Sequence, residues 1–236
     1  MPLILRVDVD KSYGRSNLLQ KIASKIAENY WLPSIPSIGY LHDLKKLLLY
    51  LNQESIKAHI YFRKCTLPPR RWFHDGLLEG HKYGLHAEDT RSFQTFKKEL
   101  EEVQAYFNSE ILSSFTKHGS GKWKSGRNHY PPYEPEKYLE WSDILGIPFL
   151  FGNKEDINEA CQPFGQYFYY PGAFWIDRPY TDYSQSSLQS VIDNARNRNI
   201  VVLMHCADFV GDAKVEEGMK QLVSIAKTQK VQWITI

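Results

Sequence analysis

The chain has 236 residues, of which 42% are hydrophobic and 24% charged, and this composition excludes wholesale disorder. The 29 Lys and Arg residues nearly balance the 27 Asp and Glu residues, so the net charge of +2 does not favour a nucleic-acid binder. Aromatic residues make up 14% of the chain, and core packing is favoured over a groove that stacks on sugars. Because there is no linker, repeat or low-complexity tract, we predict one domain over residues 1–236.

The compartment is predicted from the first residues and from the cysteines. Arg6 and Asp8 interrupt the apolar start, so a secretion signal is not expected there. No run approaches the length of about 20 apolar residues that a membrane-spanning helix needs. The cysteines are odd in number and far apart, and they fit reduced thiols better than a disulfide framework: Cys65, Cys161 and Cys206. We therefore expect a cytoplasmic protein without a membrane span.

Strand-like and helix-like segments alternate along the chain. Short apolar runs predict strands at residues 3–9, 56–62, 83–86, 113–117, 148–151, 200–204 and 231–236. Apolar residues at helical spacing predict helices at residues 40–54, 72–79, 93–107, 136–145, 188–198 and 214–228. A long polar loop is predicted at residues 119–135. The repeated strand–helix units imply an α/β fold with parallel strands, as a barrel or barrel-like sheet, with an open doubly wound sheet as the competing arrangement.

Acidic and histidine side chains follow four of the predicted strands. In parallel α/β folds the residues just past the carboxyl ends of the strands build the active site. These positions hold Asp8 and Asp10, then His86 with Asp89, then His118, and finally His205. Two neighbouring carboxylates repel each other unless a cation or a donor lies between them. Two carboxylates and three imidazoles predict a site for a divalent transition metal such as zinc, with groups left over for proton transfer.

The other histidines are interpreted differently. His81 is assigned to packing or to the surface, and structural roles are expected for His42, His59 and His74. His129 lies in the long loop, where a substrate contact and a solvated side chain are equally expected. The chain contains no nucleophile elbow and no phosphate-binding glycine loop.

Three short motifs, in this order, resemble a known family. Asp-Val-Asp at 8–10, Gly-His-Lys-Tyr-Gly-Leu-His at 80–86 and Leu-Met-His at 203–205 resemble the polysaccharide deacetylase superfamily, carbohydrate esterase family 4. The segment 56–62 also resembles the second strand of that family. The branch that it resembles most contains deacetylase-like proteins of surface-polysaccharide and O-antigen gene clusters. The resemblance covers nearly the whole chain and implies a distorted (β/α) barrel of about seven strand–helix units.

The resemblance also implies roles for five residues. Asp8 matches the catalytic base, Asp10 the metal-binding acid, and His86 the first metal-binding histidine. His205 matches the catalytic acid, and Asp177 matches the acid that orients it. These roles imply hydrolysis of an amide, in which one group activates water and another protonates the leaving amine.

Further residues are assigned by their positions near the motifs. Arg127, at the start of Arg-Asn-His-Tyr-Pro-Pro-Tyr, matches the arginine that holds the base, and Arg178 is the alternative. Aromatic side chains are expected to line the substrate site together with Arg178, and they are Trp123, Tyr130, Tyr133 and Trp175.

One position departs from the family pattern. The second metal-binding histidine of the family stands four residues after the first, and here Thr90 occupies that position. A neutral hydroxyl is a poor zinc ligand. We expect His118 to replace the missing histidine, with Asp89 as an alternative if its loop bends inward. A site that binds no metal, or binds it very weakly, is the other possibility.

These assignments combine into a predicted function. We expect one divalent ion, zinc before other metals, held by Asp10, His86 and His118. The enzyme would remove an N-acetyl group from an amino sugar in surface-polysaccharide metabolism, so its partner is an acetylated amino sugar. A hydrolase of another small amide or imide and an inactive carbohydrate-binding protein are the competing hypotheses.

Overall fold

The computed structural model describes residues 2–10, 22, 26, 30, 32, 39–107, 112, 114–119 and 128–236. Its first half contains β1 (Leu3–Asp8), α2 (Tyr40–Gln53), β2 (Ala58–Phe62), the 3₁₀ turn η1 (Lys64–Thr66), α3 (Arg71–His74), β3 (Lys82–Ala87), α4 (Phe93–Tyr106) and β4 (Phe115–Lys117). Its second half contains α5 (Pro135–Leu145), β5 (Phe149–Lys154), β6 (Gln162–Phe164), β7 (Tyr167–Gly172), β8 (Phe174–Trp175), α6 (Gln185–Ala195), β9 (Ile200–His205), α7 (Cys206–Gly211), α8 (Ala213–Thr228) and β10 (Trp233–Ile234).

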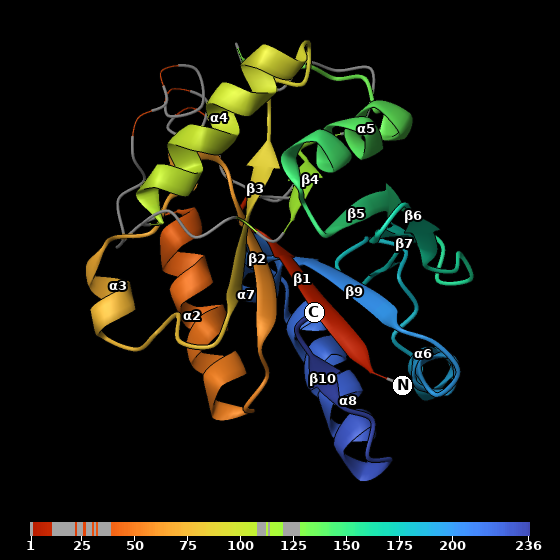
Figure 1. The fold of residues 1–236 in the computed structure, drawn as a ribbon. Helices are drawn as coiled ribbons and strands as arrows, with labels where there is room; N and C mark the ends of the chain where they lie inside the picture. Colours follow the sequence, from red (N-terminus) through yellow and green to blue (C-terminus); the bar gives the residue numbers. More distant parts are fainter. Residues whose placement is uncertain are drawn as a thin grey trace.

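The larger sheet consists of parallel strands in the order β4-β3-β2-β1-β9-β8, with β10 beside the start of β1. β1 lies between β2 and β9, and Asp8 at its end is in register with Tyr61 and with His205. Because these strands run in the same direction, their carboxyl ends share one edge of the curled sheet (Figure 1). The predicted acids and histidines follow the strands at this edge.

Alternate residues of β1 face opposite sides of the sheet. The largest hydrophobic cluster joins the leucines of α2 and apolar side chains of α6 and α8 to Leu3, Leu5 and Val7. Ile4 faces the other side and packs in a smaller cluster with side chains from β2, β5, β7 and β9. Arg6 and Asp8 follow Ile4 on this second face, so a buried arginine lies two residues before the predicted base.

A smaller sheet in the order β5-β7-β6 packs on this second face, with β5 parallel and β6 antiparallel to β7. In Figure 1 its strands lie on the opposite side of the larger sheet from α2 and α3. Gly152 of β5 lies so close to β7 that an added Cβ would be 2.4 Å from the carbonyl oxygen of Pro171. Only glycine fits there, and the close approach fixes where the end of β5 lies.

The α/β class and the barrel-like sheet of parallel strands confirm the sequence prediction. Every predicted strand and helix has a counterpart among the described residues, although α3 is shorter than predicted. Gly76, at φ +71°, follows α3 and ends it early. The sequence missed β6, β7, β8 and α7, because β6, β8 and α7 are short and prolines interrupt β6 and β7. Of the predicted loop 119–135, residues 120–127 lie outside the described residues.

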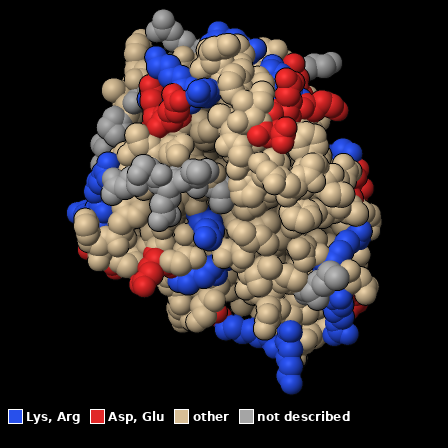
Figure 2. Space-filling view, viewed as in Figure 1, with Lys and Arg blue, Asp and Glu red and all other residues tan. Residues whose placement is uncertain are grey.

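The surface in Figure 2 carries basic and acidic side chains in small separate groups. No single sign of charge dominates this face, which agrees with the net charge of +2. Among the described residues, none of the helices combines the length and the apolar character that crossing a membrane requires.

Candidate metal and acid–base site

Five ionisable side chains from four strand ends meet at the carboxyl edge of the larger sheet. Asp8 ends β1 and Asp10 follows it, His86 lies in β3, His118 directly follows β4, and His205 ends β9. All five are buried, with exposed fractions between 2% and 9%. The structure therefore brings together the residues that the sequence placed at separate strand ends.

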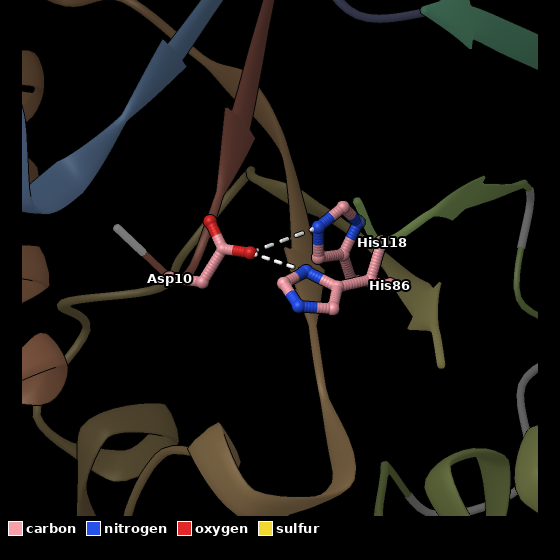
Figure 3. Close-up of side chains that lie close together, drawn as sticks. All are labelled: Asp10, His86 and His118. Carbon is pink, nitrogen blue, oxygen red and sulfur yellow. Dashed lines mark hydrogen bonds and ion pairs between the residues drawn. The ribbon is translucent and has the colours of Figure 1, made fainter. Parts of the chain in front are cut away.

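Asp10, His86 and His118 form a compact group of metal-binding atoms (Figure 3). Oδ2 of Asp10 lies 2.5 Å from Nδ1 of His118 and 3.2 Å from Nε2 of His86. The ligand atoms of this group all lie within 4.8 Å of one another. Oδ1 of Asp10 is buried and makes no hydrogen bond. One carboxylate and two imidazoles are a donor set that zinc binds in catalytic sites, so these residues fit a divalent ion.

Neutral groups hold the two histidines of this group. Nδ1 of His86 lies 2.6 Å from the hydroxyl of Thr116, which leaves Nε2 to face the carboxylate. Nε2 of His129 donates to the main-chain oxygens of His118, at 2.9 Å, and Gly119, at 3.1 Å. Burial holds the pKa of His118 well below its usual range. The imidazole of His118 is therefore neutral, and a lone pair is available for a metal.

His129 does not have the solvated side chain that was one of the two roles the sequence left open. Its side chain is buried rather than solvated, and its ring lies 5.2 Å from that of His118. The Nε2–H group is used by main-chain oxygens directly after β4. The sequence shows no signal for this role, because the two segments meet only in the tertiary structure.

The two alternative ligands after β3 point elsewhere. The hydroxyl of Thr90, a fully buried residue, lies 3.3 Å from the hydroxyl of Tyr138 in α5. The carboxylate of Asp89 binds Arg91, whose Nε lies 2.8 Å from Oδ1. Asp89 belongs to no group of metal-binding side chains within the described part of the chain. The histidine after β4 is therefore the third donor of the group.

A carboxylate holds His205. Oδ2 of Asp177 accepts hydrogen bonds from the main-chain N–H and from Nδ1 of His205, at 2.5 and 2.7 Å. Nε2 of the same ring lies 3.3 Å from Oδ1 of Asp10. Burial alone lowers the pKa of His205, but Asp177 and Asp10 outweigh it and raise the pKa to about 10. The imidazole is therefore protonated at neutral pH, as a general acid must be.

Asp208 in α7 is a further acidic residue beside this pair. It is buried, and its carboxylate lies within 4.8 Å of the ligand atoms of Asp177 and His205. Because Asp177 and His205 already bond to each other, we interpret the group as the imidazole of His205 with two carboxylates beside it, those of Asp177 and Asp208. The sequence analysis missed Asp208, because the short helix that carries it was not predicted.

Arg6 holds Asp8 from the same strand. Nε and Nη2 of Arg6 donate to Oδ1 and Oδ2 of Asp8, at 2.9 and 2.6 Å, in a bidentate ion pair. Burial raises the pKa of Asp8, but the guanidinium outweighs it, so the pKa lies below its usual value. A carboxylate that is kept ionised in this way is suited to accept a proton from water.

Among the described residues, the arginine that binds the base is Arg6, which the sequence analysis did not name for this role. Arg127 lies outside the described residues, so its contact with the base stays a prediction. Arg178 forms an ion pair with Glu155 and does not hold the base. The contact is made by Arg6, for which the sequence did contain a signal. Arg6 and Asp8 stand two positions apart in a strand and therefore share a face.

Two of the predicted substrate-binding residues lie near the strand ends. The ring of Trp175 is centred 6.1 Å from that of His205, and the guanidinium of Arg178 covers it at 3.9 Å. Tyr130 donates its main-chain N–H to the carbonyl oxygen of Glu88, which directly follows β3. Trp175 therefore borders His205, and Tyr130 is anchored beside the loop that follows β3, the strand that carries His86.

Tyr133 lies in a different environment. Its ring packs edge-on against Tyr138 at 5.6 Å, and its hydroxyl lies 3.4 Å from that of Tyr169. These contacts belong to the hydrophobic cluster around α5, not to the acid–base pair. Trp123 lies outside the described residues.

Comparison with known proteins identifies similar folds. No family model matches the chain, and no curated protein matches its sequence. A putative polysaccharide deacetylase from Mycobacterium smegmatis aligns over 100% of this chain and 93% of its own, with a TM-score of 0.50 and 12% identity. A family 4 acetyl xylan esterase from Clostridium thermocellum, solved with a cobalt ion, has a TM-score of 0.49 and 12% identity over 100% and 88% of the two chains.

A third similar structure is the catalytic domain of a peptidoglycan N-acetylglucosamine deacetylase from Eubacterium rectale. It has a TM-score of 0.48 and 12% identity over 99% of this chain and 87% of its own. At such low identity a likeness concerns the fold alone. The chain thus shares its fold with a putative polysaccharide deacetylase, and the chemistry has to be argued from the site.

Proposed function

We propose that this protein is a metal-dependent hydrolase that removes an N-acetyl group from an amino sugar in surface-polysaccharide metabolism. The observation that carries the proposal is a metal-binding group that lies directly beside an ionised base and a protonated acid. Asp10 contacts His205 as well as both metal-binding histidines, so these parts share one buried space. The motifs that resemble the polysaccharide deacetylases support the same chemistry.

The metal position is assigned to Asp10, His86 and His118. We expect zinc, because one carboxylate and two imidazoles are a donor set that suits it. An ion bound there supplies Lewis-acid chemistry, which lowers the pKa of water and polarises the amide carbonyl. Thr116 orients His86 toward this position through the 2.6 Å contact with Nδ1.

Asp8 and His205 move the protons of the reaction. The ionised carboxylate of Asp8 takes a proton from the attacking water, while Arg6 keeps that carboxylate in place. The protonated imidazole of His205 gives the Nε2 proton to the sugar nitrogen as the carbon–nitrogen bond breaks. Asp177 holds the opposite ring nitrogen and stabilises the charged imidazolium. Water and the amide are thereby converted into acetate and a free amine.

The sugar is assigned from the surroundings of the acid. The ring of Trp175 is centred 6.1 Å from that of His205, so it borders the place where a sugar would meet the acid. We expect Trp175, Arg178 and Tyr130 to contact an acetylated amino sugar, and we assign no nucleic-acid partner. A cytoplasmic location fits a substrate that is modified during polysaccharide assembly.

Acetate release tests this function. The zinc-loaded protein is incubated with free, nucleotide-linked and polymeric N-acetylated amino sugars, and released acetate is measured. We expect acetate from at least one sugar and almost none after His205→Ala. His42→Ala, which removes a half-buried histidine of α2 outside the site, is the control and should retain full activity. A zinc-loaded protein that releases no acetate from any sugar would contradict the proposal.

The inactive carbohydrate-binding hypothesis loses its main support. It was motivated by Thr90, which stands in place of the second histidine of the family. In the structure His118 lies beside Asp10 and His86, which supports its assignment as the donor that Thr90 cannot be. A protein that only binds carbohydrate also has no need for an ionised base close to a protonated acid.

A further inference from the structure

Asn153, near the end of β5, lies between the base and the metal-binding group. Its Oδ1 accepts a hydrogen bond from Nη2 of Arg6 at 3.0 Å. Its Nδ2 donates to the main-chain oxygen of Lys117 at 2.9 Å. β1 and β4, which carry these two partners, are separated by β2 and β3 in the larger sheet. One amide side chain therefore connects two strands that do not touch each other in that sheet.

The Arg6 contact acts on the base. Nη2 of Arg6 donates to both Asp8 and Asn153, and Nη1 donates to the carbonyl oxygen of Gly152 at 2.7 Å. These contacts from β5 fix the plane of the guanidinium. Because Arg6 binds both oxygens of Asp8, the orientation of the carboxylate follows that plane.

The Lys117 contact acts on the metal-binding group. The carbonyl of Lys117 and the N–H of His118 belong to the same planar peptide unit. Asn153 binds that carbonyl, and the N–H donates to the main-chain oxygen of Ala87 at 2.8 Å. The peptide unit that precedes the side chain of His118 is thus held from both sides.

We propose that Asn153 is a positioning residue that sets the base and the metal-binding His118 relative to each other. The catalytic half of this inference rests on the proposed function, whereas the metal half rests only on the donor group. Asparagine suits the position because its amide offers one acceptor and one donor in a fixed plane. A leucine has a similar size and offers neither, so Asn153→Leu removes both contacts without opening a cavity.

A second asparagine provides a matched control. Asn52 at the end of α2 also uses both ends of its amide, because Nδ2 donates to the carbonyl of Leu77 at 2.9 Å and Oδ1 accepts from Lys57 at 3.1 Å. None of these residues belongs to the site. Asn52→Leu therefore removes these two hydrogen bonds, and a contact with Nε2 of His81 at 3.2 Å, at a place that affects stability and not the site.

The experiment measures zinc affinity, thermal stability, kcat and KM for both variants. We expect Asn153→Leu to weaken zinc binding about 10-fold and to lower kcat about 10-fold to 100-fold, the range found for residues behind metal ligands. KM should change little. Asn52→Leu should lower the melting temperature to a similar extent and leave zinc affinity and kcat unchanged. Normal zinc affinity and kcat in Asn153→Leu, or equal losses in Asn52→Leu, would overturn the inference.

A double variant tests whether Asn153 acts through Arg6. If it does, adding Asn153→Leu to Arg6→Met should lower kcat by less than it does in the wild type, because the contact is already gone. The loss of zinc affinity should be the same in both backgrounds. Losses of kcat that simply multiply would overturn the link to the base. A wild-type protein that binds zinc but releases no acetate would remove the proposed function, and zinc affinity alone would then decide the inference.

Discussion

The metal side and the acid–base side of the site hold their side chains in different ways. On the metal side the hydrogen-bond partners that come from outside the ligand group are neutral, as in the contact between the hydroxyl of Thr116 and His86. On the acid–base side the partners are charged: the guanidinium of Arg6 binds Asp8 in a bidentate ion pair. The two sides lie at the same edge of one sheet. They nevertheless differ in the charge of the groups that hold their side chains.

The difference follows from what each side chain has to do. A metal ligand must keep a lone pair free, so a neutral hydrogen bond orients it without adding a proton. A proton carrier must begin the reaction in a defined charge state, and a charged partner sets that state. His118 and His205 illustrate this, because burial leaves the first neutral, while Asp177 and Asp10 raise the pKa of the second to about 10.

The largest expected effect comes from removing a donor on the metal side. His118→Ala should weaken zinc binding by more than about 100-fold, because a lost ligand costs more than a lost supporting group. Thr90→Ala should leave zinc affinity almost unchanged, since its hydroxyl faces Tyr138. Zinc titration with a competing chelator measures both. Unchanged affinity in His118→Ala would move the third ligand to another residue.

The next effect comes from the acid–base side. Asp8→Asn and His205→Ala should each lower kcat by about 10²-fold to 10⁴-fold, the usual contribution of a positioned base or acid. Elemental analysis should still find zinc in both variants, because neither residue is assigned as a ligand. If Asp8→Asn emptied the site, Asp8 and Asp10 would have to exchange roles, and the separation into two sides would fail.

A smaller effect tests the neutral partners. Thr116→Val removes the hydroxyl beside His86 and keeps a side chain of similar size. We expect zinc affinity to fall about 10-fold, at the lower end for a group behind a metal ligand. Ser114→Ala is a neighbouring control, because its hydroxyl contacts Tyr61 instead of a metal-binding histidine. Equal zinc affinity in Thr116→Val and Ser114→Ala would show that the contact with His86 does not matter.

The smallest effect concerns a buried histidine away from the site. His81 accepts a hydrogen bond from the main-chain N–H of Ala58, and burial together with Lys57 lowers its pKa from 6.5 to about 4. Between these values the unfolded chain binds the proton and the folded protein does not, so stability falls as the pH drops below 6.5. The contribution is at most about 1.4 kcal/mol per pH unit.

Replacement of this residue isolates that contribution. His81→Gln keeps one acceptor and one donor but does not titrate. The free energy of unfolding in urea should therefore depend less steeply on pH than in the wild type between pH 6.5 and about pH 4. If the free energy of unfolding depends on pH equally steeply in both proteins, His81 binds its proton in the folded state as it does in the unfolded chain.

Much of the site was predictable because its signals are local. Asp8, Asp10, His86 and His205 each stand at or just past the end of an apolar run, and parallel strands carry such positions to one edge. The α/β barrel-like fold followed from the alternation of periodic segments. The single-domain organisation and the choice of zinc stay predictions.

Other parts of the site were not predictable, because they depend on which distant segments meet. The hydrogen bond from Asn153 to Lys117 joins residues 36 positions apart, and the hydrogen bond from Arg6 to Asn153 joins residues 147 positions apart. His129 shows the same, since nothing in its loop indicates that it binds the main chain after β4.

The sequence by itself determined the alternation of most strands and helices and which acids and histidines stand at the strand ends, because spacing and alternation act within a few residues. Only the tertiary structure decided how these groups are held. It paired Asp8 with Arg6, brought His118 to Asp10 where Thr90 could not serve, and placed β5 across the site. Hydrogen bonds and ion pairs depend on distance in space, and distance in space between remote segments is set only when the core has packed.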